Sequence, residues 1–335
     1  MNLKKLGWNQ YFNDKLNEFN IKEDYKVARV AVEYKNSYKL FLDSDEMLGQ
    51  ISGKMHYARR FPVVGDWVLV SLISDDRAII HEILPRKSKF SRKTAGGVTE
   101  EQIVAANIDT IFLVSSLNQD FNLRRIERYL TIAWDSGAKP VIILSKADLS
   151  EDNEVKKAEV QEIAYGVPVH LISSLTGEGI EELDEYLIEG STSALLGSSG
   201  VGKSTLINKI LGEEKLKTNE IRSYDGKGKH TTTNRELIIL PGGGVIIDTP
   251  GMKEIQLWDG SEGLNESFKD IETLAQNCHF NDCQHDSEPK CAVKKAIKDG
   301  VMTKERLESY RKLQRELKYM EIKKERGARA VEKYK

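Results

Sequence analysis

Residues 197–204 read GSSGVGKS and have the residue types and spacing of a phosphate-binding loop. They match the pattern G-x-x-x-x-G-K-[ST] in full, with an apolar strand before them and a helix after them, as this motif requires. The glycines let backbone N–H groups converge on phosphate oxygens, aided by the partial positive charge of the helix N-terminus. We expect Lys203 to reach the β- and γ-phosphates and Ser204 to coordinate Mg²⁺. The residues expected to bind the phosphates are Gly197, Ser198, Ser199, Gly200, Val201, Gly202, Lys203, Ser204 and Thr205.

The tetrapeptide SKAD, earlier in the chain, is suited to reading a purine base. It closely resembles the N-K-x-D signature of guanine-specific GTPases, and its residues are Ser145, Lys146, Ala147 and Asp148. Guanine offers two adjacent donors, N1–H and the 2-amino group, and the Asp148 carboxylate has two acceptors spaced to take both. Adenine would leave a buried carboxylate unpaired, at a cost of about 1–3 kcal/mol, so guanine is the expected base.

A second loop and one departure from the signature complete the expected base site. The segment SSL resembles the S-A-x loop whose backbone N–H meets guanine O6, and its residues are Ser173, Ser174 and Leu175. Ser145 stands where the signature has asparagine, an amide that both donates to the base and ties this loop to the phosphate loop. Serine has a shorter reach and a single donor. We therefore expect weaker nucleotide binding with the guanine preference retained.

Two segments after the phosphate loop are suited to sensing the γ-phosphate. The sequence DTPG places Asp248 at the end of an apolar strand and Gly251 three residues later, where a D-x-x-G motif contacts the γ-phosphate through Mg²⁺ and a backbone N–H. The segment GKGKHTTT at 226–233 is rich in Gly and Lys, as expected of a mobile switch. Either Thr231 or Thr232 is expected to complete the magnesium shell, and the sequence leaves the choice open.

The group that activates water differs from the one that many GTPases use. Those enzymes place a glutamine directly after D-x-x-G, but here that position is Met252, whose thioether cannot orient a water molecule. Slow intrinsic hydrolysis is therefore expected. The missing group would come from His230 in the first switch or from a partner, and the alternative for His230 is an ordinary surface histidine.

The three cysteines of the chain, Cys278, Cys283 and Cys291, fall within one segment that also contains His279 and His285. In a reducing compartment this clustering indicates metal binding rather than disulfides. Four soft or borderline ligands within 14 residues suit a closed tetrahedral Zn²⁺ site that has no open position for catalysis. Free thiols packed in a core are the alternative.

The elements that must position these motifs alternate between strands and helices, which implies a parallel sheet covered by helices on both faces. Ligands of such sheets bind at the carboxyl ends of the strands, where every motif above falls. We expect strands at 108–116, 139–149, 167–174 and 192–197. We expect helices at 122–137, 153–166, 179–190 and 204–212, with Asn122 capping the first and Gly137 ending it.

Residues 25–85 precede these elements and read as five short strands separated by turn residues, which predicts a small barrel. The expected strands are 25–34, 37–43, 47–55, 66–73 and 77–84. An oligonucleotide-binding barrel is one candidate, because basic and aromatic side chains lie near its middle, at Tyr57, Arg59, Arg60 and Phe61. A barrel that only contacts the neighbouring domain is the alternative. Residues 86–97 are basic and read as a linker or mobile loop.

Charge is distributed unevenly along this chain of 335 residues, whose formal net charge is −2. Residues 290–335 hold 16 Lys and Arg against 7 Asp and Glu, which suggests a polyanionic partner for the tail or, as the alternative, a solvated helical surface. No apolar run is long enough to span a bilayer, and the N-terminus lacks the apolar core of a signal peptide. We therefore expect a cytoplasmic protein with no membrane partner.

The order of the motifs is a cyclic shift of the usual one, because both base-reading loops come before the phosphate loop. This permuted order, the small barrel before it and the Cys/His segment after it resemble the ribosome small-subunit-dependent GTPase A family (RsgA, also called YjeQ) over nearly the whole chain. The resemblance implies a GTP- and GDP-binding factor that binds the 30S subunit and its 16S rRNA late in maturation and hydrolyses GTP in response. It also favours His285 over His279 as the fourth zinc ligand. A monomer fits a factor that docks on a larger particle.

The expected fold is therefore multidomain. An N-terminal OB-fold β-barrel at 1–90 would bind RNA, a central circularly permuted α/β P-loop GTPase domain would occupy 91–256, and an α-helical zinc-binding domain would occupy 257–335. Because the second switch leads directly into the third domain, rearrangement at Asp248 and Gly251 could pass to an RNA-facing element.

Two other functions are compatible with parts of the sequence. One is a nucleotide-gated RNA-binding module whose hydrolysis is incidental, and it differs from the first in whether turnover is needed for release. The other is a P-loop ATPase or small-molecule kinase, which Asp148 and the lack of an evident acceptor site oppose.

Overall fold

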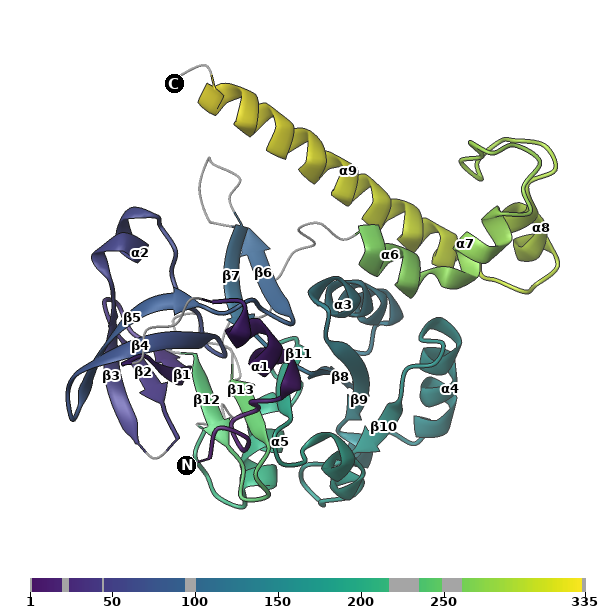
Figure 1. Ribbon diagram of the computed structural model, residues 1–335. Helices are drawn as coiled ribbons and strands as arrows, with labels where there is room; N and C mark the ends of the chain where they lie inside the picture. Colours follow the sequence, from purple (N-terminus) through teal and green to yellow (C-terminus); the bar gives the residue numbers. More distant parts are fainter. Residues whose placement is uncertain are drawn as a thin grey trace, which may run out of the picture.

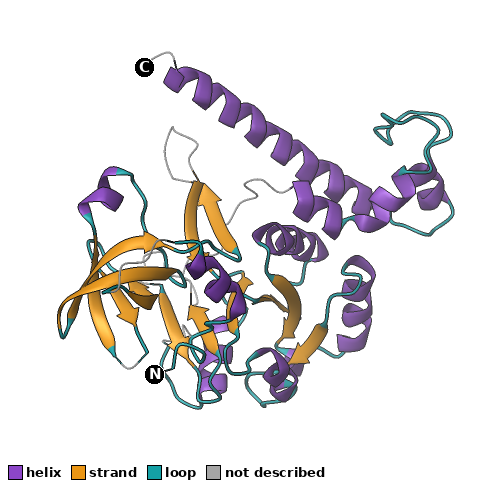
Figure 2. Ribbon diagram, in the orientation of Figure 1, coloured by secondary structure: helices purple, strands orange, loops and turns teal. Residues whose placement is uncertain are grey.

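The computed structural model describes residues 2–19, 24–43, 45–93, 101–216, 235–248 and 261–332. These residues form an N-terminal β-barrel, a central sheet flanked by helices and a C-terminal group of helices (Figures 1 and 2). This is the multidomain arrangement expected from the sequence. Among the residues just given, no helix is both long and apolar enough to cross a membrane.

Five short strands form the barrel, as predicted. In chain order they are β1 (Lys26–Glu33), β2 (Tyr38–Phe41), β3 (Glu46–Ile51), β4 (Trp67–Ser74) and β5 (Arg77–Ile83). They pair in the order β1-β2-β3-β5-β4, and β4 pairs again with β1, which closes the barrel. Apolar side chains that alternate along the strands fill the interior, among them Val30, Leu40, Val68 and Ile80.

The predicted third strand is too long at its end. Residues 53–57 form the short helix α2 (Gly53–Tyr57), because the backbone turns at Ser52, whose hydroxyl accepts a hydrogen bond from the Met55 amide. Met55 packs into the barrel core, while Tyr57 is almost fully exposed. The expected strand therefore ends at Ile51.

A helix that was not predicted, α1 (Gln10–Asn17), lies between the barrel and the central sheet (Figure 1). The Trp8 and Phe12 rings pack against Trp67 of the barrel, with ring centroids 4.9 Å and 5.7 Å from it. Aromatic contacts of this kind bury a large apolar area, which fixes the N-terminal segment on the barrel.

The central sheet has five parallel strands in the order β10-β9-β8-β11-β13, followed by the antiparallel β12. Their bounds are β8 (Thr110–Ser116), β9 (Lys139–Ser145), β10 (Val169–Ile172), β11 (Thr192–Gly197), β12 (Glu236–Ile239) and β13 (Val245–Asp248). The four strands predicted at 108–197 are present, and β12 was not predicted.

Helices cover this sheet. They are α3 (Leu123–Ser136), α4 (Asn153–Ile163) and α5 (Lys203–Leu211), with the 3₁₀ helices η1 (Ala147–Leu149) and η2 (Ile180–Tyr186). Asn122 caps α3 by accepting from the Arg125 amide, and Gly137 ends it in the left-handed conformation, as predicted. Residues predicted as a helix at 179–190 form only the 3₁₀ helix η2, which follows Gly179 in the left-handed conformation and ends at Tyr186.

The segment predicted as a linker at 86–97 contains a strand instead. β6 (Lys89–Lys93) pairs antiparallel with β7 (Glu101–Ala106), and the Phe90 side chain is buried in the core that α3 also lines. Lys89 is exposed and Phe90 is buried, so successive side chains of this strand face solvent and the core. This hairpin crosses the boundary expected between residues 90 and 91.

The barrel and the central sheet are joined through β1 and β12, where Val32 pairs with Glu236. The eleven strands therefore form one continuous hydrogen-bonded sheet. A buried arginine, Arg29, reinforces this junction by donating to the carbonyls of Leu6, Gly65 and Asn107. Those carbonyls belong to the N-terminal segment, the barrel and the turn before β8, so one side chain links all three.

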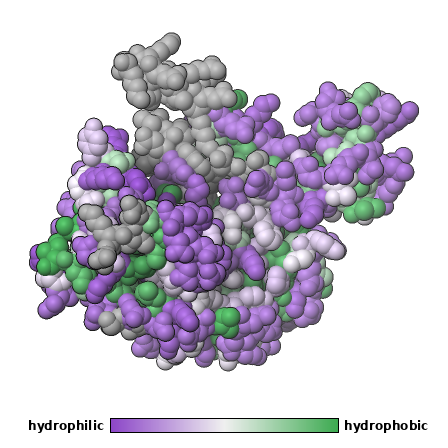
Figure 3. All heavy atoms as spheres, in the orientation of Figure 1, coloured by the Kyte–Doolittle hydropathy of each residue, from purple (hydrophilic) through white to green (hydrophobic). Residues whose placement is uncertain are grey.

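The C-terminal group consists of α6 (Ser261–Ser267), α7 (Lys269–Ala275), α8 (Ala292–Lys298) and α9 (Lys304–Glu332). The long helix α9 runs across the molecule above α3 (Figure 1). Hydrophilic residues cover most of this group on the face that Figure 3 shows, and larger hydrophobic patches of that face lie over the barrel.

Candidate functional site

The motifs that the sequence singled out meet at one edge of the central sheet. Ser145 ends β9, Gly197 ends β11 and Asp248 ends β13, and these strands run in the same direction. Ser173 directly follows β10. Parallel strands place their carboxyl ends together, so residues far apart in the sequence surround a single site.

The phosphate loop, residues 197–204, has backbone conformations and close contacts that favour glycine at several positions. Gly200 and Gly202 have φ of 78° and 100°, in the left-handed region. At Gly197 a Cβ atom would lie 2.4 Å from the Val114 carbonyl oxygen of the neighbouring strand. The loop is therefore pressed against β8 and then turned sharply into α5, which starts at Lys203.

The Lys203 side chain folds back over the phosphate loop. Its Nζ donates to the carbonyls of Gly197 and Ser198, both at 2.7 Å. The ammonium group thus lies beside the first two residues of the loop. This is the position from which a lysine reaches bound phosphates.

Asp248 faces the same edge of the sheet. Burial raises the pKa of its carboxyl group, the positive charge of Lys203 opposes that rise, and Glu236 opposite it on β12 adds to it. A cation bound beside Asp248 would favour the charged carboxylate and reverse the effect of burial. The geometry therefore suits a carboxylate that interacts with a divalent cation.

The two base-reading loops are joined by a side-chain hydrogen bond. The Ser173 hydroxyl, fully buried, donates to Oδ1 of Asp148 at 2.6 Å and accepts from the Thr176 amide at 3.1 Å. Asp148 itself is exposed, so burial of its carboxylate requires a base to cover it. The sequence suggested only a backbone contact from the second loop. The serine hydroxyl directly after a buried strand was the available signal.

Ser145 connects the base-reading strand to the phosphate loop despite its short side chain. The hydroxyl lies 2.7 Å from the Val201 carbonyl and 3.4 Å from the Ser115 carbonyl, and the shorter contact is the stronger one. Ser145 is buried, so water does not compete for this bond. The tie between the two loops, which asparagine makes in the usual signature, is thus retained by serine.

The remaining expected site residues divide into two groups. Lys146 takes a left-handed conformation with φ 60° at the start of η1, and Leu175 is exposed on the second base loop. Ser204 lies half-buried in the first turn of α5. Four expected residues lie outside the described residues: His230, Thr231, Thr232 and Gly251.

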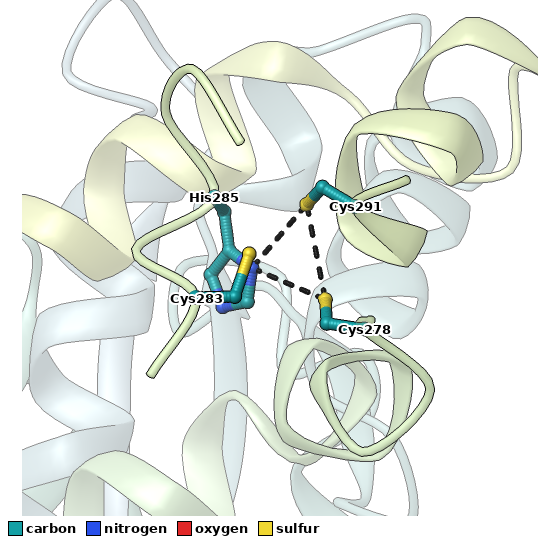
Figure 4. Close-up of side chains that lie close together, drawn as sticks. All are labelled: Cys278, Cys283, His285 and Cys291. Carbon is teal, nitrogen blue, oxygen red and sulfur yellow. Dashed lines mark hydrogen bonds between the residues drawn. The ribbon is translucent and has the colours of Figure 1, made fainter. Parts of the chain in front are cut away.

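A second site lies between α7 and α8, where four side chains converge (Figure 4). Their ligand atoms all lie within 4.8 Å of one another, and they belong to Cys278, Cys283, His285 and Cys291. The Sγ atoms of Cys278 and Cys291 are 3.8 Å apart, and each lies 3.6 Å or less from Nδ1 of His285. A tetrahedral ion with bonds of about 2.3 Å to sulfur and 2.0 Å to nitrogen requires separations of this size.

The local structure explains why these four residues meet. Cys278 follows the end of α7, and Cys291 is the N-cap of α8, where its Sγ accepts from the Lys294 amide. Burial lowers the pKa of His285, helped by the nearby charge of Arg311, which favours the neutral ring that a metal binds. His279 is exposed and packs against Phe280, away from the cluster. The four ligand atoms therefore fit a closed metal site.

Comparisons with known proteins identify the family of the chain. The family model for the RsgA GTPase matches residues 83–258. The small ribosomal subunit biogenesis GTPase RsgA 2 of Lactiplantibacillus plantarum is 50% identical over 299 residues, which cover 88% of this chain and 84% of that protein. The small ribosomal subunit biogenesis GTPase RsgA of Opitutus terrae is 44% identical over 333 residues, covering 95% and 90%.

Two solved structures are similar in fold. The crystal structure of YjeQ from Thermotoga maritima has a TM-score of 0.67 and 28% identity, covering 88% of this chain and 98% of that one. The crystal structure of YloQ, a circularly permuted GTPase, has a TM-score of 0.63 and 24% identity, covering 90% and 97%, and supports the fold alone.

Proposed function

Since the chain belongs to the RsgA GTPase family and is a GTP hydrolase, we propose that it acts in the biogenesis of the small ribosomal subunit. Relatives named small ribosomal subunit biogenesis GTPases match it over most of its length. The observation that carries the proposal is the convergence of Asp148, Lys203 and Asp248 on one edge of the sheet in a permuted chain. In that chain the metal cluster and basic helices follow the nucleotide site directly.

Guanine recognition rests on Asp148 and the two loops beside it. Ser173 fixes one carboxylate oxygen, which orients the pair of acceptors toward the N1–H and 2-amino donors of the base. The stem of Lys146 covers the base, and the loop of Ser174 and Leu175 supplies the amide for O6. Ser145 holds the base-reading strand on the phosphate loop, so the two halves of the nucleotide bind to connected elements.

Phosphates and Mg²⁺ would bind at the loop and the sheet edge. The loop amides and Lys203 take the phosphates, Ser204 and Asp248 face the cation, and Gly251 and either Thr231 or Thr232 complete the site. Bound Mg²⁺ supplies charge neutralisation at the β- and γ-phosphates. We assign activation of the attacking water to His230 or to a group on the ribosomal subunit, since Met252 cannot do it.

The metal of the Cys/His cluster is proposed to be zinc, one ion per chain. Three thiolates and one imidazole are the donors that a structural Zn²⁺ prefers, and the four protein ligands leave no position for substrate. Held together, Cys278 and Cys291 would fix the end of α7 against the start of α8. The ion would then stabilise the C-terminal group of helices rather than take part in hydrolysis.

RNA contacts are assigned to the barrel at 1–90 and to the basic helices of the domain at 257–335. Tyr57, the last residue of α2, is 93% exposed, and Phe61 in the loop that follows is 49% exposed. Arg59 and Arg60 lie between them, and this combination suits stacking and phosphate contacts with 16S rRNA. In α9 basic side chains predominate, and phosphate contacts there would strengthen binding without base specificity. A monomer in the cytoplasm suits this role.

The order of the chain supports a relay from the second switch to the C-terminal domain, which we include in the proposal. Asp248 ends β13, and α6 begins at Ser261, so few residues separate the γ-phosphate sensor from the zinc-binding domain at 257–335. A rearrangement at Asp248 on hydrolysis would shift the start of this domain and change its RNA contacts.

The test is hydrolysis of GTP and ATP by the purified full-length protein, with and without purified 30S subunits. We expect GTP to be hydrolysed slowly alone and much faster with 30S subunits, ATP to be a poor substrate, and 50S subunits to give no stimulation. A GTPase rate that 30S subunits leave unchanged would contradict the ribosomal role while leaving the guanine site intact.

A further inference from the structure

Helix α3 lies between the phosphate loop and the C-terminal helices, and it contacts both (Figure 1). The Tyr129 hydroxyl of α3 is 3.3 Å from the Ser198 hydroxyl, the second residue of the phosphate loop. Tyr129 is 8% exposed, so the rest of its ring is packed in the core. This contact is a side-chain hydrogen bond to the loop from an element outside the nucleotide motifs.

The C-terminal helices contact the opposite side of α3, at Glu127, two residues before Tyr129. Glu127, fully buried, accepts from Arg306 of α9 at 2.9 Å and from Arg124 of its own helix. Residues two apart on a helix point about 200° away from each other. Glu127 and Tyr129 therefore point in nearly opposite directions. Glu127 faces the C-terminal helices, and Tyr129 faces the phosphate loop.

Arg306 is the centre of this interface. Besides Glu127, its guanidinium donates twice to Asp270 and once to the Ser267 carbonyl, and it stacks 4.2 Å from the Phe268 ring centroid. It is 5% exposed. A planar guanidinium with all these partners has one position, so it fixes α6, α7 and α9 relative to α3.

The backbones of α3 and α6 also touch. A Cβ at Gly263 of α6 would lie 2.3 Å from the Thr131 carbonyl and 2.7 Å from the Asp135 amide, so no side chain fits there. A close-packed interface of this kind transmits a displacement rather than absorbing it. Movement of α6 would therefore move α3, and with it Tyr129.

We propose that Tyr129 is a positioning residue for the phosphate loop, acting through Ser198, and that α3 makes this position depend on the docked C-terminal helices. The proposal rests on the nucleotide-binding role of the loop. The hydroxyl of Tyr129 holds Ser198 where the loop begins, so the following amides face the phosphates before nucleotide arrives. The C-terminal helices in turn hold α3 through Arg306.

The first test is a double-mutant cycle on the full-length protein, with GDP affinity measured by titration of a fluorescent GDP analogue. Tyr129→Phe removes only the hydroxyl, and Ser198→Ala removes its partner. We expect each to weaken GDP binding about threefold to tenfold, the range of one neutral hydrogen bond, and the double variant to be no weaker than either alone. The KM for GTP should rise with kcat nearly unchanged.

Tyr165→Phe is the matched control, because Tyr165 is 95% exposed and follows α4 rather than lying on α3. Unchanged GDP affinity in Tyr129→Phe, or additive losses in the double variant, would overturn the positioning role. A parent protein that binds no GDP would instead refute the nucleotide site itself, so the two failures are distinct.

The second test concerns the dependence on the C-terminal helices. Arg306→Lys keeps the charge beside Glu127 but cannot maintain the three other contacts at once, so the fold is retained with a looser interface. We expect weaker GDP binding in this variant and no further loss when Tyr129→Phe is added. Arg315→Lys, an exposed position on the same helix, should bind as the parent does. If Arg306→Lys weakened GDP binding by the same factor in the parent and in the Tyr129→Phe variant, the link through α3 would be overturned.

Discussion

The Ser173 hydroxyl donates a 2.6 Å hydrogen bond to the Asp148 carboxylate, so the two loops that surround the base are joined before any base is bound. One oxygen of Asp148 is fixed by this bond, and the carboxylate plane is fixed with it. Preorganised acceptors of this kind lose little conformational freedom when a ligand arrives.

Replacing Ser173 by alanine should therefore loosen base recognition. We expect Ser173→Ala to weaken GDP binding about threefold to tenfold, because the carboxylate must then be ordered on binding. Discrimination against IDP, which lacks the 2-amino group, should narrow. Parallel titrations of both nucleotides measure this. The control is Ser150→Ala, a nearby serine whose hydroxyl bonds to Asp152 and Lys156 rather than to Asp148. If Ser173→Ala kept the parent's ratio of GDP affinity to IDP affinity, Ser173 would have no role in base recognition.

Replacing Asp148 by asparagine should change which base is preferred. The amide offers a donor where the carboxylate had an acceptor, and xanthine has a carbonyl where guanine has its 2-amino group. We expect Asp148→Asn to lose GTP by a factor of about 10² or more and to gain XTP. Hydrolysis of both nucleotides by parent and variant decides this. Retained GTP preference would mean that another group reads the base.

The serine at position 145 allows two opposite changes. Ser145→Ala removes the hydrogen bond to the Val201 carbonyl and should weaken GTP binding about threefold to tenfold. Ser145→Asn should strengthen it, since the amide can keep this tie and donate to the base as well. Affinities for a non-hydrolysable GTP analogue are the measurement. If Ser145→Asn bound the GTP analogue no more tightly than the parent does, the serine at position 145 would not be a cause of weaker nucleotide binding.

The raised pKa of Asp248 predicts a pH dependence for magnesium. Burial makes the folded carboxyl bind a proton more readily than the unfolded chain does, so its unfavourable contribution to stability is relieved as pH falls through the raised pKa. Protons and Mg²⁺ then compete for the same group. Affinity for Mg²⁺ with a GTP analogue should fall as the pH is lowered, and Asp248→Asn should bind Mg²⁺ weakly with a shallower pH dependence. If Mg²⁺ affinity depended on pH in the same way in the parent and in Asp248→Asn, protonation of Asp248 would not be the cause.

Removal of the metal should affect stability before it affects nucleotide binding. We expect one zinc per chain after gentle purification, and a strong chelator should lower the temperature at which the C-terminal helices unfold, because the thiolates lose their common partner. GDP affinity should fall only if loss of the metal also loosens the packing of these helices on α3. Metal analysis and thermal unfolding monitored by circular dichroism are the measurements, with Cys291→Ser as the variant. Less than one zinc per chain would contradict a zinc site.

The sequence was sufficient for the parts of the fold that depend on local pattern. The five barrel strands follow from alternation and turn residues, and α3 follows from its apolar spacing, its Asn122 cap and Gly137. The carboxyl-edge site follows from the parallel sheet. These features depend on neighbours within a few residues or on general rules of topology.

Other features depend on contacts between distant residues, which no local pattern contains. The basic residues of β6 predict a linker, because only the pairing with β7 and the burial of Phe90 make them a strand. The bonds from Ser173 to Asp148 and from Ser145 to Val201 join separate loops, so their geometry exists only in the folded chain. A serine in the sequence does not reveal which carbonyl or carboxylate it faces.

The pairing of Val32 with Glu236 also bears on how this chain is made. All five barrel strands, from Lys26 to Ile83, leave a translating ribosome long before β12 does, and β4 closes the barrel without it. The barrel can thus fold early by itself, whereas the edge of β1 must wait for a strand synthesised much later. Completion of the shared sheet is then a late step of folding, and the same step brings β13, with Asp248 at its end, into place.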